Sequence, residues 1–160
     1  MSSTDQHVPT RSDQPQAHGD YSVARLGGGL VFTAGMTPRR GNAMDGVGVV
    51  GADIAIDHAA RLAGHAAQRA IEAARTVARQ AGLAIEEAVS LTVYVRAWPG
   101  FAAHSAVADG ASAVLERELG GPRPARAAVG VASLPARASV EVTAVFSTAP
   151  VSVGVDGEGS

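Results

Sequence analysis

Near the middle of the chain, the hydrophobic period changes from about 3.6 residues to about two. Over residues 56–81, apolar side chains form one stripe and charged or polar side chains the opposite one, a pattern that predicts an amphipathic helix. Gly82 stands where a left-handed cap would end it. Next, AVSLTVYVRAW (residues 88–98) alternates and predicts a strand. Its apolar face would hold Val89, Leu91, Val93 and Val95.

Shorter elements are predicted on both sides of this helix and strand. YSVARL and LVFTAG, joined by three glycines, predict a hairpin, because glycine adopts the positive φ angles of tight turns. Pro99 is expected to open a second helix with an apolar stripe ending at Leu119, and Gly110 within it indicates close backbone approach. ARAAVGVA and ASVEVTAVF predict two last strands, joined as an antiparallel hairpin by the SLPAR turn. The segment before the first helix reads as a loop, with a short extended piece at residues 47–50.

The order β-β-α-β-α-β-β predicts an α+β fold with two helices packed on one face of the sheet. The other face would carry Tyr94, Thr92, Glu141 and Thr143, and nothing else in the chain is available to cover it. We expect a second copy of the chain to cover it, because a closed symmetric oligomer buries the exposed face of every subunit.

Composition limits the class of protein. In 160 residues, 46% are hydrophobic but only 4% aromatic, so small side chains must fill one closely packed core. We expect a single domain over residues 20–147, between an N-terminal tail (1–19) and a C-terminal tail (148–160) that are too polar to order. The net charge of −2 argues against nucleic acid and membrane surfaces as partners. Without cysteine, a signal peptide or a long apolar run, the chain is expected to be soluble and cytoplasmic.

Several motifs are present only in part. GVGVVG (residues 46–51) matches a dinucleotide-binding G-x-G-x-x-G, but no buried strand precedes it, and Glu72 lies inside the predicted helix. His58, His65 and His104 lack the spacing and carboxylates of a metal site and read as surface histidines. No serine-hydrolase, P-loop or zincin motif occurs, so we expect neither a metal nor a cofactor.

Arg126 and Glu141 carry the remaining chemical signal. A guanidinium at the mouth of an apparently buried strand requires an anion. A hairpin between the last two strands would bring Glu141 near Arg126, so the two could share one pocket. A structural ion pair or an edge-strand charge is the alternative for each residue.

Four segments carry a resemblance to a known family: YSVARLGGGLVFTAGMTP, AGLAIEEAVSLTVYVRAWPGFAAH, RPARAAVGVASLP and VEVTAVF. Together they resemble the Rid family, the RidA/YjgF enamine and imine deaminases, over about residues 20–147. VADGASAVLERELG further resembles a bacterial subgroup with a longer segment before the first helix. The resemblance implies a chorismate-mutase-like fold and a homotrimer with active sites in the clefts between subunits.

The resemblance also implies roles for individual residues. Arg126 would grip the carboxylate of a 2-imino or 2-enamino acid, so the anion that it lacks would be the substrate. Glu141 would orient or deprotonate the attacking water. Further substrate contacts are implied for Tyr21, Gly35 and main-chain groups around Ala127 and Ala128.

The chain departs from the family pattern at Ala34, where many relatives have Ser, at Ala128, where some have Cys, and at Ser105, where Asn is frequent. The preferred substrate is therefore not carried over. The expected activity is cofactor-free hydrolysis of 2-imino acids, such as 2-iminobutanoate and 2-iminopropanoate, to 2-keto acids and ammonia, which removes reactive metabolites. Two alternatives are a non-catalytic module that binds small carboxylates and a ribonuclease, the activity attached to the family by name.

Overall fold

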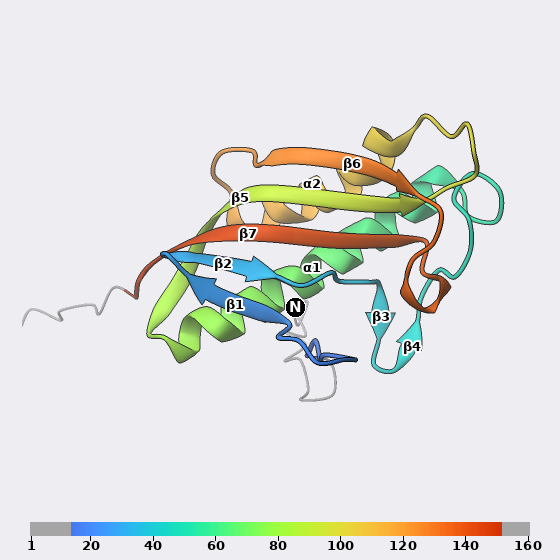
Figure 1. Cartoon of the computed structure of the whole chain (residues 1–160). Helices are drawn as coiled ribbons and strands as arrows, with labels where there is room; N and C mark the ends of the chain where they lie inside the picture. The colour runs from blue at the N-terminus through green and yellow to red at the C-terminus, as the bar shows by residue number, and fades with distance from the viewer. Residues whose placement is uncertain (1–13, 152–160) are drawn as a thin grey trace, which may run out of the picture.

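Two helices pack against one face of a five-stranded sheet in the computed structural model, which describes residues 14–151 (Figure 1). The sheet order is β1-β2-β7-β5-β6, and β3 and β4 form a separate short hairpin. The strands are β1 Ala24–Gly27, β2 Leu30–Thr33, β3 Arg39–Arg40, β4 Ala43–Met44, β5 Leu83–Arg96, β6 Ala125–Val131 and β7 Val140–Pro150. The helices are α1 Ile56–Gln80, α2 His104–Leu119 and a 3-10 turn at Pro135–Arg137. The predicted α+β class, with both helices on one face, is confirmed.

Helix α1 forms the centre of the core with small side chains. Seven of its buried alanine and leucine residues lie on the predicted stripe: Leu62, Ala63, Ala66, Ala67, Ala70, Ala74 and Ala78. Ala59, Gly64 and Ala73 are buried as well. Gly82 has φ +72° and follows the last turn of the helix, as predicted. Helix α2 crosses α1 at Gly110, where any Cβ would overlap the backbone carbonyl of Ala60. The predicted close approach at Gly110 is confirmed.

Helix α2 begins at His104, so the prediction that Pro99 opens it is wrong. Gly100 has φ +97°, a conformation that an α-helix excludes, and the chain needs a turn there before the helix can start. Phe101 consequently lies before the helix and packs edge-on against the ring of His104, with ring centroids 5.0 Å apart.

Strands β5 and β7 form the centre of the sheet, with Leu91, Val93 and Val95 buried against the helices. Val89 was predicted on this face but is 44% exposed. The register of β5 against β7 shifts between Ala88 and Ser90, so Val89 is an extra residue in a bulge. The bulge turns Ala88 inward in its place.

Strand β6 is an edge strand, so the predicted antiparallel hairpin of the last two strands is wrong. β6 pairs with β5 in parallel, and β5 lies between β6 and β7. Parallel pairing requires a long crossover between the strands, which α2 supplies. Most residues of β6 are exposed, so Arg126 does not stand at the mouth of a buried strand as expected.

The segment before α1, predicted as a loop, contains the short hairpin of β3 and β4 and, after it, isolated bridges. Val50 bridges to Ala97 and Val47 to Ala138, which agrees with a short extended piece at residues 47–50. The carboxylate of Asp53 accepts a hydrogen bond from the backbone N–H of Val49 at 2.9 Å. The glycines of the GVGVVG motif therefore belong to a turn that packs against the sheet.

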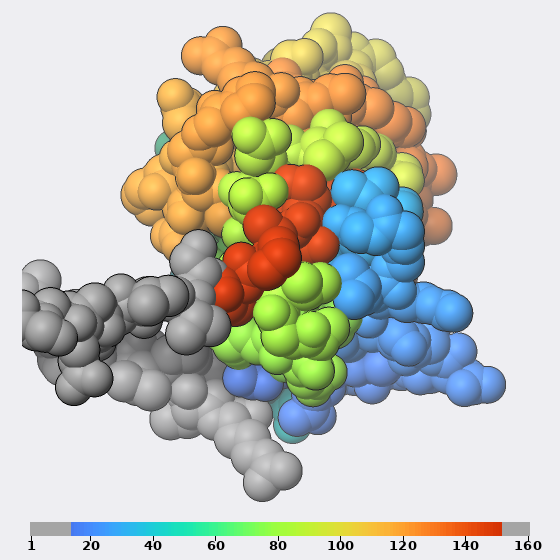
Figure 2. Space-filling model, turned by 90° about the vertical axis from the view of Figure 1, so that its left-hand side faces the viewer, coloured from blue at the N-terminus to red at the C-terminus, as the bar shows by residue number. Residues whose placement is uncertain are grey.

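Strand β7 continues to Pro150, three residues beyond the predicted domain end at 147. Residues 148–150 pair with the start of β5, which begins earlier than predicted, and Figure 2 shows β7 (red) between β2 (blue) and β5 (green) at this end. The rest of the C-terminal tail (152–160) and most of the N-terminal tail (1–13) lie outside the described residues.

The face of the sheet opposite the helices is open within the described part of the chain (Figure 1). Thr92, Tyr94, Thr143 and Glu141 are half-buried there, as predicted. Phe32 is 48% exposed, and its strand partner Val145 lies beside it on the same face. This face therefore combines apolar and polar side chains without a covering layer.

Candidate functional site

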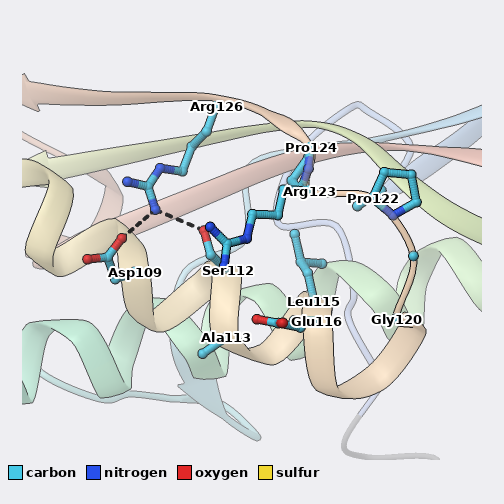
Figure 3. Close-up of a pocket in the computed structure, with 12 residues that line it drawn as sticks. Asp109, Ser112, Ala113, Leu115, Glu116, Gly120, Pro122, Arg123, Pro124 and Arg126 are labelled. Atoms are coloured by element: carbon cyan, nitrogen blue, oxygen red, sulfur yellow. Dashed lines mark hydrogen bonds and ion pairs between the residues drawn. The ribbon is translucent and has the colours of Figure 1, made fainter.

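The residues predicted to form one site surround two different cavities. Arg126 lines a cavity of about 430 Å³ between α2 and the loop at residues 120–124 (Figure 3). Tyr21, Gly35 and Glu141 line a second cavity of about 470 Å³. We refer to these as the Arg126 cavity and the Glu141 cavity.

Arg126 already has an anionic partner within the chain. In Figure 3 its side chain extends from β6 toward α2, where Nη1 donates to Asp109 Oδ1 at 2.7 Å and to Ser112 Oγ at 2.9 Å. The Arg126 side chain is only 24% exposed, although its backbone lies on the open edge, whereas Asp109 is 69% exposed. The expectation that only a substrate could supply the anion is wrong, because one face of α2 carries both acceptors three residues apart.

The guanidinium keeps free donors for a ligand. It carries five N–H groups, and both hydrogen bonds found in the described part of the chain use Nη1. Nε and Nη2 can still offer two parallel hydrogen bonds to a carboxylate. Arg126 is thus held in place by α2 and remains able to bind a small acid.

Glu141 lies in a different setting. Its strand partner is Tyr94, on the open face, and burial raises the pKa of its carboxyl above the ordinary value. The carboxyl group packs directly over Gly35, where any Cβ would overlap it. Tyr21 lies at the entrance, 52% exposed, and its hydroxyl accepts a hydrogen bond from the backbone N–H of His18 at 3.4 Å. A glycine floor therefore makes room for a carboxyl that can serve as a base.

The side chains of Arg126 and Glu141 point to opposite sides of the sheet. Arg126 is in register with Leu91, which faces the helices, whereas Glu141 is in register with Tyr94, which faces away from them. Directly paired residues point to the same side of a sheet. Arg126 and Glu141 therefore cannot contact one small substrate within one chain, and the predicted shared pocket is wrong for a single copy. The cause is β5, which lies between their strands.

Ala127 and Ala128 follow Arg126 on the edge strand and line neither cavity. Ala127 is exposed and Ala128 half-buried. Because β6 has a partner on one side only, part of its backbone is free to pair with another molecule. The main-chain contacts implied by the resemblance are thus possible only from the open edge.

Sequence reasoning missed two cations of the Glu141 cavity, Arg69 and Arg39. Arg69 was placed on the polar stripe of the first helix, but it is only 8% exposed. Its Nη1 donates to the backbone carbonyl of Arg39 at 3.2 Å, and burial lowers the pKa of its guanidinium. The hairpin of β3 and β4 covers this part of α1. The 3.6-residue hydrophobic period of the helix does not indicate that another segment buries one of its polar positions.

Asp109 and Ser112 are the other residues that were missed. Ser105, the expected substitute for a family asparagine, is exposed in the first turn of α2, and Asp109, one turn later, contacts Arg126. Ala34, where the resemblance implies a serine, lines the Glu141 cavity. Acidic residues are common at solvent-facing helix positions. The sequence alone therefore could not identify Asp109 as a partner of Arg126, because this contact depends on where β6 lies in the sheet.

Residues 14–151 contain no group of three or more His, Cys, Asp or Glu side chains that could hold a metal ion. His65 is half-buried, and burial together with Arg40 and Arg69 lowers the pKa of its imidazole. Over the same residues, no helix is long and apolar enough to cross a membrane.

Comparison with known proteins agrees with this architecture. The family model described as Endoribonuclease L-PSP matches residues 11–147. The Agrobacterium tumefaciens protein Atu1372, of unknown function, is 33% identical with a TM-score of 0.75, covering 85% of this chain and 86% of that one. No curated protein matches the chain.

Two more distant structures share the fold. Escherichia coli TdcF with bound serine is 22% identical with a TM-score of 0.57, covering 86% of this chain and 95% of that one. RidA from an Antarctic Psychrobacter species is 24% identical with a TM-score of 0.57, covering 86% and 96%. Together with the order of the sequence motifs, the family match and the Agrobacterium relative lead to one conclusion: the chain belongs to the Endoribonuclease L-PSP family, the Rid/YjgF family that its sequence resembles.

Proposed function

We propose that the protein hydrolyses 2-imino acids to 2-keto acids and ammonia at a site completed by two copies of the chain. The observation that carries the proposal is the division of the site residues between the two faces of the sheet. Arg126 and the backbone of β6 would come from one copy. Tyr21, Gly35 and Glu141 would come from its neighbour.

The open surfaces support such an assembly. β6 is an unpaired edge, and the sheet face that bears Glu141 is uncovered and partly apolar. A ring of copies in head-to-tail contact joins two different surfaces of each subunit and repeats the same composite site at every interface. A homotrimer is a small ring of this kind, and it is the assembly that the family resemblance implies.

The chemistry follows from the side chains. The free donors of Arg126 bind the substrate carboxylate, and Glu141 takes a proton from water as the oxygen adds to the imine carbon. The nitrogen gains that proton to complete a tetrahedral amino alcohol. Transfer of the hydroxyl proton to the nitrogen through Glu141 then breaks the C–N bond, so that ammonia leaves and the C=O bond forms. Water and imine are consumed, keto acid and ammonia are released, and the raised pKa makes Glu141 a stronger base for the first step.

A second candidate is a module that binds small acids without turnover. The Arg126–Asp109 ion pair favours it, because a cation that already has a counter-charge at 2.7 Å needs no catalytic partner to be stable. The serine bound in the TdcF neighbour also agrees with a small amino-acid-like ligand. Ribonuclease activity has less support, since the net charge of −2 provides no general attraction for phosphates.

Hydrolysis of an imino acid generated in situ tests the proposal. An amino-acid oxidase supplies the imine, and its disappearance is followed with and without the purified protein. We expect acceleration by the parent and its loss in Arg126→Ala. No acceleration by the parent, or equal rates for parent and variant, contradicts the deaminase; tight binding of a keto acid without turnover favours the binding module. A solution mass near one chain by light scattering contradicts the shared site.

A further inference from the structure

We propose that Asp109 makes the Arg126 cavity selective for zwitterionic ligands, acids that carry a protonated nitrogen next to the carboxylate. The inference rests on the proposed function for the identity of the reactive ligand. It adds a reason why the site would favour an imino acid over the keto acid that replaces it.

The geometry places a free acceptor beside free donors. Only Oδ1 of Asp109 takes part in the bond to Arg126, and no hydrogen bond to Oδ2 occurs among residues 14–151. Both side chains line the same cavity, and Figure 3 shows the carboxyl and guanidinium groups pointing toward one another. A ligand carboxylate on Nε and Nη2 of Arg126 would therefore have a carboxylate oxygen of the protein within reach of its substituents.

This arrangement distinguishes nitrogen from oxygen at the carbon next to the ligand carboxylate. A protonated imine or amine presents N–H groups there, which Asp109 can accept in a charge-assisted hydrogen bond. A 2-keto acid presents a carbonyl oxygen, so two acceptors would face each other without a proton between them. The same side chain therefore attracts the substrate and repels the product.

The charge of the cavity wall agrees with a ligand of no net charge. Its ionisable lining residues are Arg123, Arg126, Asp109 and Glu116, two cations and two carboxylates. A simple carboxylate would add one negative charge to this balanced set, whereas a zwitterion leaves the balance unchanged.

A purely structural ion pair is the competing explanation for Asp109. The carboxyl is 69% exposed, and exposed ion pairs contribute little to folding stability. Asp109→Asn should therefore fold like the parent under either explanation. Ligand selectivity distinguishes the two explanations. If Asp109 only pairs with Arg126, its removal should not change the preference of the cavity for a ligand nitrogen over a ligand oxygen.

The test compares the affinities of two stable ligands, L-serine and pyruvate, by calorimetry. We expect the parent to bind serine more tightly than pyruvate, and Asp109→Asn to shift the ratio of the two dissociation constants toward pyruvate by about tenfold or more. Asp109→Ala should shift it in the same direction. Asp57→Asn removes the same charge from an exposed site on α1 and should leave the ratio within about twofold.

The outcomes separate this inference from the proposed function. An unchanged ratio in both Asp109 variants overturns the inference, as does a parent that binds pyruvate as tightly as serine or binds neither ligand. Imine hydrolysis without selectivity leaves the deaminase standing and removes the role of Asp109. Selectivity without hydrolysis supports the role of Asp109 and contradicts the deaminase.

Discussion

The Arg126 cavity and the Glu141 cavity are similar in volume, but their ionisable groups are stabilised differently. In the first, an arginine is neutralised within the chain by an acid at 2.7 Å, and the lining charges balance. In the second, burial alone raises the pKa of Glu141, and Arg69 is almost entirely buried beside the backbone of Arg39. A charge that is paired locally suits recognition, whereas a carboxyl held away from solvent suits proton transfer. The two groups assigned to the proposed imine-hydrolysing site, Arg126 and Glu141, thus point to opposite faces of the sheet in one chain.

The largest loss of activity is expected from substituting either Arg126 or Glu141. Arg126→Ala deletes two charged hydrogen bonds to the substrate carboxylate, and Glu141→Gln deletes the base, so each should lower kcat/KM for imine hydrolysis by about 100-fold or more. Initial rates at several imine concentrations measure this. Asp57→Asn, at an exposed position of α1, is the control that should retain the parent rate. A decrease in kcat/KM of less than about threefold would mean that the substituted residue does not contact the substrate or the attacking water.

Mixing the two inactive variants tests whether the halves come from different copies. If each site uses Arg126 of one subunit and Glu141 of the next, random mixed assemblies of the two variants contain about one intact site in four. Co-expressed Arg126→Ala and Glu141→Gln should therefore recover about a quarter of the parent rate. Recovery close to zero, with mixed assemblies present by mass spectrometry, would place both residues in one subunit's site.

A smaller and one-sided effect is expected from Gly35→Ala. The added Cβ would overlap the Glu141 carboxyl, which must move away, while Arg126 points to the opposite face of the sheet and is untouched. Turnover should fall by about tenfold, because misplacing a catalytic group by about 1 Å has costs of this order or greater. Serine affinity at Arg126 should stay within about twofold of the parent. An equal loss of turnover and of serine binding would argue against two independent halves.

The pH dependence of stability should also report the burial of Glu141. Its folded pKa lies above the reference value of 4.5, so the folded state holds a proton that the unfolded state has released, and stability falls as pH rises through that window. Glu141→Gln has no carboxyl to ionise and should not show this decrease in stability. In thermal unfolding, the melting temperature of the variant minus that of the parent should therefore increase from pH 4 to pH 7. A constant difference across this range would mean that burial does not affect the carboxyl.

The smallest effect is expected from His65, which lies on α1 one turn before Arg69. Its folded pKa lies below the reference value of 6.5, because burial and two nearby arginines disfavour the imidazolium. The unfolded chain therefore takes up a proton first, and stability present above pH 6.5 is lost as pH falls through the window below it. His65→Gln should reduce this acid-side loss in thermal unfolding from pH 7 to pH 5. An unchanged slope would show that His65 does not contribute.

The amino-acid sequence by itself determined the elements whose signal is local. The stripe of α1, the three-glycine hairpin and the cap at Gly82 depend on spacing or φ preference, and each lies where the sequence predicted it. The close approach at Gly110 was also predictable, since a glycine inside an apolar stripe has few other uses. Family membership followed from the order of the motifs along the chain.

Tertiary structure alone decided which groups meet. The sequence predicts that ARAAVGV is a strand but not which neighbour it pairs with. Its parallel pairing with β5 turned Arg126 toward the helices and away from Glu141. Asp109 reaches Arg126 only because α2 returns the chain across β5 to the sheet edge. The bulge at Val89 likewise depends on register against β7, 50 or more residues later. Contacts between distant segments depend on the packing of whole elements, and local periodicity carries no record of that packing.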